Sequence, residues 1–267
     1  MEQELYKNRS AAACVRAAYQ LFTDNFRTIM RRIWLPTLAL ATALASAYIP
    51  PLRLLSPIVS IVAFIWFYTR LFPLFNGQPQ RKNLTKVLKL WFLGMAIAFV
   101  GEAIGVAVWG VFVTVPSLTP HLPVAIGVLA TVAALLALVF SLPLFYFVMK
   151  YVMEDVSMRH TLWPSLKTGL RHWGFLFVVM FITTLILGLI SIIVLMPMMI
   201  LNIAQLQSAT GVIMGDPSGL PSGFMWLLTI TTIVTFFIVV IMEVWLMCVL
   251  YYAYGSIEQQ ERERKTL

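Results

Sequence analysis

WGFLFVVMFITTLILGLISIIVLMPMMI, residues 173–200, contains no charged residue over its whole length. A helix needs roughly 20 apolar residues to cross the hydrocarbon core of a bilayer, so this stretch is long enough. It also lacks the alternation of apolar and polar residues that the strands of a membrane barrel show. The stretch therefore predicts a transmembrane helix.

The rest of the chain has the same character. Hydrophobic residues make up 60% of the 267 residues and charged residues only 11%, which a soluble domain of this size could not cover with polar surface. We therefore predict an all-α integral membrane protein with six transmembrane helices. The other five apolar runs are residues 34–47, 54–75, 91–115, 122–151 and 224–252. Residues 34–47 are short for a full crossing, so this helix must be tilted, partly embedded or extended by the residues before it.

The six runs pair into three hairpins within one membrane domain. Pro50 and Pro51 end the first run, and the short Pro116–Pro120 connection allows only an antiparallel turn between the third and fourth runs. The predicted parts are an N-terminal interfacial helix at 1–33, hairpins at 34–75, 76–151 and 152–252, and a cytoplasmic tail at 253–267. The second and third hairpins include their basic lead-in segments.

The cationic residues predict the orientation of the chain. Cytoplasmic loops of membrane proteins carry an excess of Lys and Arg, and placing both termini inside puts sixteen such residues in the cytoplasm against Arg53 alone outside. The sixteen are Lys7, Arg9, Arg16, Arg27, Arg31, Arg32, Arg81, Lys82, Lys86, Lys89, Arg159, Lys167, Arg171, Arg262, Arg264 and Lys265. We expect the chain in a cytoplasmic membrane, with anionic lipid headgroups as partners of its basic face.

A short motif recurs where each hairpin begins. A cation, one spacer residue and a tryptophan occur as Arg32-Ile-Trp34, Lys89-Leu-Trp91 and Arg171-His-Trp173. A cation can stay with the lipid phosphates while the indole rests at headgroup level. Any membrane helix can start in this way, but three occurrences in step with the hairpins favour an internal repeat with these residues as interfacial anchors.

The segments before these tryptophans have amphipathic patterns. In the first, apolar residues such as Val15, Phe22 and Ile29 recur at helical spacing, and Arg16 and Arg27 lie opposite. We expect three basic amphipathic helices at the inner surface of the bilayer, or else plain cytoplasmic extensions of the transmembrane helices. Thr23-Asp24-Asn25 are residues that favour helix ends, and they predict a break in the first segment.

Three pieces of the chain resemble a known family. Tyr146–Asp155, with the sequence YFVMKYVMED, and Leu162–Trp173, with the sequence LWPSLKTGLRHW, resemble the joint between hairpins in bacterial six-helix proteins related to the glycerophosphodiester phosphodiesterase membrane-domain family. Ala17–Phe26, with the sequence AAYQLFTDNF, resembles the opening of those proteins. The resemblance implies repeated hairpins with interfacial helices in a bacterial cytoplasmic membrane. It implies no active site, because the soluble phosphodiesterase domain has no counterpart in this chain.

No motif in the sequence carries recognisable chemistry. The chain has no P-loop, no H-E-x-x-H zinc motif and no G-x-S-x-G nucleophile elbow, and its three histidines are scattered. We therefore expect no enzyme activity, no cofactor and no metal site. The positive charge follows one membrane face and no nucleic-acid module is present, so we expect no nucleic-acid partner.

Two acidic residues fall within the predicted transmembrane helices. Glu102 lies eleven residues after Trp91, and Glu243 lies nine before Tyr252, so both should lie near mid-membrane. A charged carboxylate there costs at least ~2.5 kcal/mol, so each should face the bundle interior, hold a proton or have a partner. Arg70 and Lys150 are the nearest candidate cations. Each acid is then either a structural group bound to a hydroxyl or indole, or part of a polar site.

Small residues predict where two helices approach each other. Gly101 and Gly105 flank Glu102, and Ala130 and Ala134 lie on one side of the fourth predicted helix. Small residues allow close packing of transmembrane helices, so we expect these two faces to meet. Pro143 should kink the fourth helix and free a backbone carbonyl.

Two functions remain open. The first is a non-enzymatic scaffold or accessory protein that binds lipid or a partner complex. The second is a small transporter or an ion or proton conduit that uses Glu102 and Glu243. A dry core with each carboxylate bound to a hydroxyl or indole would favour the first, and a polar cavity that reaches both acids would favour the second.

Overall fold

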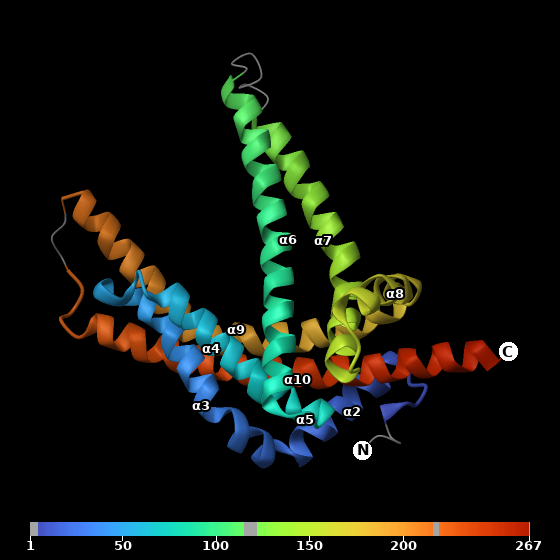
Figure 1. Ribbon diagram of the computed structural model, residues 1–267. Helices are drawn as coiled ribbons and strands as arrows, with labels where there is room; N and C mark the ends of the chain where they lie inside the picture. The colour runs from blue at the N-terminus through green and yellow to red at the C-terminus, as the bar shows by residue number, and fades with distance from the viewer. Residues whose placement is uncertain (1–4, 115–121, 216–218, 267) are drawn as a thin grey trace. The chain divides into compact units, whose positions relative to one another are not determined.

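The computed structural model describes residues 5–114, 122–215 and 219–266, and every regular element in these ranges is helical (Figure 1). The N-terminal elements are α2 (Ala11–Asp24), α3 (Phe26–Ala45), the 3-10 turns η1 (Ser46–Tyr48) and η2 (Pro50–Leu52), α4 (Ser56–Leu71) and α5 (Pro73–Asn76). The remaining elements are α6 (Gln80–Thr114), α7 (Leu122–Met153), α8 (Met158–Arg171), α9 (Trp173–Ile213) and α10 (Phe224–Thr266).

Five helical segments of the described residues are long and apolar enough to cross a membrane. They are Ser56–Asn76, Gln80–Ala107, Ile126–Met153, Trp173–Ile213 and Phe224–Thr266. The chain is thus an all-helical, multi-pass membrane protein. The first predicted helix, residues 34–47, is not among the five, because it forms the second half of α3, whose first half carries Arg27, Arg31 and Arg32.

The described residues form two compact units, and each is treated by itself below. Unit 1 comprises Met1–Gln80 with Val178–Leu267, and unit 2 comprises Arg81–Phe177.

In unit 1, α3 packs along α4, and α10 packs on both α2 and α3. Figure 1 shows α3 and α4 side by side, joined by the two 3-10 turns. The hydroxyl of Ser56, at the start of α4, donates to the carbonyl of Ala43, near the end of α3, at 2.9 Å. This hydrogen bond joins the two helices next to the turn. The core of the unit contains fully buried Phe67, Leu71 and Val244. This hairpin corresponds to the one predicted over residues 34–75.

The N-terminal segment of unit 1 lies on the end of α10. The backbone N–H of Arg9 donates to the Ser256 hydroxyl at 3.0 Å, and this hydroxyl donates to the Arg9 carbonyl at 3.2 Å. Gly255 allows the approach, since a Cβ there would lie 2.4 Å from the carbonyl oxygen of Leu5. Residues 253–266 of the predicted cytoplasmic tail are helical and form the last turns of α10.

In unit 2, α8 packs on α7. The contact is closest where Gly169 meets Pro143, because a Cβ on Gly169 would lie 2.7 Å from the Pro143 Cα. Tyr146, Phe147 and Val152 of α7 are buried beneath this contact. Pro143 lies inside α7, as the sequence predicted for the fourth transmembrane helix.

Two single-residue breaks share one local structure. Asn25 separates α2 from α3 with φ −106° and ψ 9°, and His172 separates α8 from α9 with φ −98° and ψ 21°. Both α2 and α8 have 14 residues. Two buried residues of each helix match in position, with Cys14 and Thr161 eleven residues and Ala18 and Ser165 seven residues before their breaks. The break predicted at Thr23-Asp24-Asn25 is confirmed.

The two breaks do not fall at matching positions of the predicted motif. The residue after the first break is Phe26, and the residue after the second is Trp173. The sequence motif had aligned Trp34, eight residues later, with Trp173. In addition, α6 runs without interruption from Gln80 through Trp91, so the second basic segment is an extension of its helix.

Candidate functional site

Glu243, one of the two acids predicted to lie near mid-membrane, has a partner inside unit 1. Its carboxylate accepts a hydrogen bond from the hydroxyl of Tyr68, which joins α10 to α4. Tyr68 is buried and packs edge-on against Phe67. A carboxyl group and a phenol that face each other among apolar helices satisfy each other's polar atoms away from water. This is the structural alternative that the sequence analysis left open for Glu243.

Glu102 is placed differently from Glu243. It is exposed, and within the described residues its carboxylate has no hydrogen-bond or ion-pair partner. Glu102 shares this exposure with its surroundings, since none of the residues in the most apolar part of α6 is buried. Within unit 2, Glu102 therefore does not face a helix-lined interior, and an interior site that includes both acids stays a prediction.

Neither candidate cation binds the acid of its own unit. These pairs would be Arg70 with Glu243 in unit 1 and Lys150 with Glu102 in unit 2. Arg70 lies on α4 two residues after Tyr68, but Glu243 bonds to the phenol instead. Lys150 pairs with Glu154 of its own helix, with 3.4 Å between Nζ and Oε1, and lies 5.9 Å from the ring centre of Tyr146. Lys150 thus belongs to a charge cluster at the end of α7.

Trp173, which the sequence predicted as an interfacial anchor, makes a hydrogen bond within unit 2. Its indole Nε1 donates to the carbonyl of Val139 at 3.2 Å. Val139 lies four residues before Pro143, and a proline has no N–H to donate to that carbonyl. Trp173 therefore satisfies the carbonyl that Pro143 frees, and its ring stacks on Phe177 with 5.1 Å between ring centres.

The other predicted anchors are surface residues. Arg32, Lys89 and Arg171 are exposed, and Trp34 is half exposed within α3. Trp91 lies in the middle of α6, with its ring 5.1 Å from that of Phe92.

The small residues predicted to pack together are not brought together. Gly101 and Gly105 are exposed, and a Cβ on either would meet no atom within 4 Å. Ala130 and Ala134 are exposed on α7. Unit 2 instead uses Gly169 as its small packing residue, at a position that the sequence analysis did not single out.

Lys86 is the structural residue that sequence reasoning missed. The sequence counted it as one of the basic residues of a loop, but it is 6% exposed and donates to the carbonyls of Val152 and Glu154 at 2.9 and 2.8 Å. These carbonyls lie at the C-terminal end of α7, where a cation is favoured by the unpaired carbonyls and the helix dipole. Beside it, Lys82 bonds to Asp155 at 2.8 Å, and this hydrogen bond with its charge lowers the pKa of Asp155.

The described residues contain no group of three or more His, Cys, Asp or Glu that could hold a metal ion. Comparisons with the models of known families, with curated proteins and with solved structures find no match for this chain.

Proposed function

We propose that this chain is a non-enzymatic scaffold or accessory protein of the cytoplasmic membrane, with lipids and a partner complex as its ligands. The observation that carries the proposal is the bond from Tyr68 to Glu243. A conduit for protons or ions would need this carboxylate to face a polar path. A carboxylate held by a buried phenol instead ties α4 to α10, which is a structural task.

The proposal includes six transmembrane helices, with α3 as the first and both termini in the cytoplasm. The ends of the chain touch in unit 1, where Gln260 donates to the Asn8 side chain at 3.1 Å and Asn8 donates to Glu263 at 3.4 Å. Ends that touch lie on one side of the membrane, so the number of crossings is even. Five apolar helices plus α3 give six, and the cationic bias favours the cytoplasm for that side.

We further propose that α2 and α8 lie in the interface of the inner leaflet. In α2, Cys14, Val15 and Ala18 are buried while Arg16 and Gln20 are exposed. A helix with one packed face and one polar face suits the headgroup region. The shared geometry of the two helix breaks supports the resemblance to the glycerophosphodiester phosphodiesterase membrane-domain family, which we retain as a proposal for the architecture.

The test compares wild type with Glu243→Gln and Tyr68→Phe in sealed vesicles and in native membranes. We expect vesicles with the wild-type chain to show no proton flux above empty vesicles under an imposed pH gradient. The same proteins should co-purify from native membranes with wild type and with Glu243→Gln, since glutamine can still accept from Tyr68. A flux in wild type that Glu243→Gln abolishes and Tyr68→Phe retains would replace the scaffold by the transporter.

A further inference from the structure

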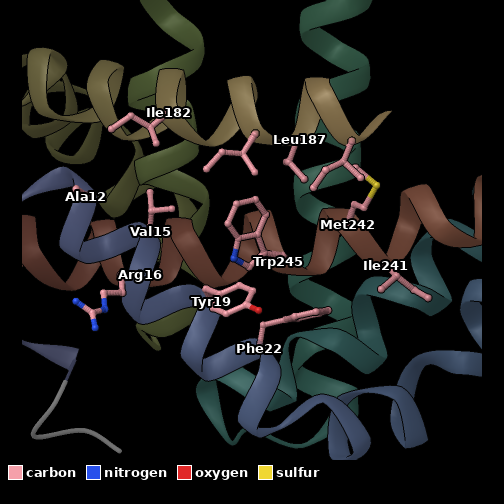
Figure 2. Close-up of a pocket in the computed structure, with 12 residues that line it drawn as sticks. Ala12, Val15, Arg16, Tyr19, Phe22, Ile182, Leu187, Ile241, Met242 and Trp245 are labelled. Carbon is pink, nitrogen blue, oxygen red and sulfur yellow. The ribbon is translucent and has the colours of Figure 1, made fainter. Parts of the chain in front are cut away.

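Unit 1 contains an apolar pocket between α2, α9 and α10. Its volume is about 490 Å³, which is within the range of small-ligand pockets. Figure 2 shows its wall as aliphatic and aromatic side chains, among them Val15 and Phe22 of α2, Ile182 and Leu187 of α9 and Met242 of α10. Glu243 is not part of this lining, although its neighbour Met242 is. An apolar lining of this kind suits the hydrocarbon chain of a lipid.

One polar group in the wall of the pocket has no hydrogen-bond partner among the described residues. Trp245 lines the pocket and is only 9% exposed, and its indole Nε1 is fully buried without a hydrogen bond in the described structure. Figure 2 shows this nitrogen on the side of the ring toward Tyr19 of α2. An indole N–H is a donor only, and leaving it unpaired away from water is unfavourable. A ligand that fills the pocket should therefore bring an acceptor oxygen.

A positive charge stands at the margin of the same pocket. Arg16 of α2 lines it, is exposed, and has no ion pair among the described residues. In Figure 2 its guanidinium points outward from the apolar wall. Guanidinium binds phosphate oxygens through two parallel hydrogen bonds, so it suits an anionic headgroup at the rim.

We propose that this pocket binds one anionic glycerophospholipid. An acyl chain occupies the apolar wall, an ester carbonyl accepts from the indole of Trp245, and the phosphate lies at Arg16. A free fatty acid has one polar end and could serve only one of these two groups. The proposal uses the interfacial position of α2 from the proposed function and does not depend on the scaffold role.

The first test measures headgroup preference. The purified full-length chain is mixed with equal amounts of palmitoyl-oleoyl phosphatidylglycerol and phosphatidylcholine, and retained lipid is counted by native mass spectrometry. Wild type should retain one phosphatidylglycerol per chain. Arg16→Gln should reduce the preference for it about tenfold, as loss of a charge-assisted bond does. Arg27→Gln, an exposed arginine of α3 outside the pocket, should retain the preference.

The second test addresses the buried indole. Trp245→Phe should weaken retention of ester-linked phosphatidylglycerol about tenfold and leave the ether-linked analogue, which lacks the carbonyl, unchanged. Trp226→Phe is the matched control, since Trp226 is on α10 but 70% exposed. Leu187→Trp should fill the pocket and prevent retention of both lipids, and thermal melting checks that each variant is folded.

Three outcomes would overturn the proposal. One is equal retention of the two headgroups by wild type. Another is displacement of phosphatidylglycerol by oleate, which would assign the pocket to a fatty acid. The third is a change of oligomeric state in Leu187→Trp with lipid retention unaltered, which would assign the pocket to a second copy of the chain. None of these results bears on the flux and co-purification measurements, so failure of the lipid site and failure of the scaffold can be told apart.

Discussion

Gly169 is the residue on which the packing of α8 depends most directly. Its missing side chain lets α8 approach the backbone of Pro143, and a Cβ would lie 2.7 Å from the Pro143 Cα. Gly169→Ala should lower the stability of the chain by about 1–3 kcal/mol, since added atoms in a tight contact force the helices apart. Thermal melting in detergent measures the effect.

The matched control is Gly174→Ala, because a Cβ at Gly174 meets no atom within 4 Å. Alanine in an open helical position should keep or raise stability by up to about 1 kcal/mol. Equal melting temperatures for the two variants would show that α8 does not depend on this contact.

Cys14 gives a second prediction at the level of one side chain. Burial raises the pKa of its thiol to about 11, against a partial lowering by the charge of Arg9. At pH 8 the folded chain should therefore hold about a hundredfold less Cys14 thiolate than an unfolded chain does. Alkylation at pH 8, located by peptide mass spectrometry, should be slow in detergent micelles and fast after denaturation.

The same thiol links stability to pH. Between pH 9 and about 11 the folded chain keeps a proton on Cys14 that the unfolded chain has lost. The contribution of Cys14 to the free energy of unfolding therefore falls as the pH rises through this window. Rapid labelling of Cys14 in the folded chain at pH 8 would contradict its burial.

The two mid-membrane acids show what one sequence can predict about a residue. Spacing from Trp91 and Tyr252 predicted that the charges of Glu102 and Glu243 would be costly in a membrane, and in unit 1 Glu243 accepts a hydrogen bond from Tyr68. Tyr68 could not be chosen as that partner, because it lies 175 residues away in the chain. Pairs of this kind are set by tertiary packing.

At the scale of the element, Lys86 holds the end of α7. Its ammonium group bonds to two carbonyls at the C-terminal end of α7, and it is nearly buried. Lys86→Met should destabilise the chain by about 1.5–3 kcal/mol, since two hydrogen bonds from a charged donor are lost. Lys89→Met, at an exposed position one turn later, should change the melting temperature little. Similar losses in both variants would mean that a general charge effect is at work.

Pro143 and Trp173 form a coupled pair between α7 and α9. Trp173→Phe should cost about 1 kcal/mol, because the Val139 carbonyl loses its donor. In a Pro143→Ala background the restored N–H of residue 143 can bond to that carbonyl, so the same substitution should cost less. A double-mutant cycle of melting temperatures measures this coupling. Additive losses would show that the indole bond contributes nothing.

The sequence predicted the elements better than their register. Apolar runs identified the five long helices, and Asn25 was recognised as a helix break. The motif of a cation, a spacer and a tryptophan did not predict the helix break at His172, because His172 ends α8 by backbone conformation and shares no side-chain chemistry with Asn25. The close approach at Gly169 was also missed, since a lone glycine in an amphipathic segment gives no signal of what it packs against.

For the molecule as a whole, hydropathy identifies a helical membrane protein, but it cannot predict which helices pack against each other. The prediction that α6 and α7 pack through Gly101, Gly105, Ala130 and Ala134 used a general preference of membrane helices. In the structure these residues are exposed, and the buried residues of α7 lie instead from Leu142 onward, in the part of the helix on which α8 packs. A stripe of small residues indicates where another helix can pack closely, and it does not indicate which helix that is.

The contact between the two ends of the chain leads to a prediction about topology. The side chains of Asn8 and Gln260 bond at 3.1 Å, so Asn8→Cys and Gln260→Cys should be joined within one chain by a short bifunctional maleimide. Both cysteines should react with a membrane-impermeant maleimide only in inside-out vesicles. Arg53→Cys, in the exposed turn before α4, should react only in right-side-out vesicles. Labelling of Asn8→Cys and Gln260→Cys from opposite sides would require an odd number of crossings, and α3 would then not span the membrane.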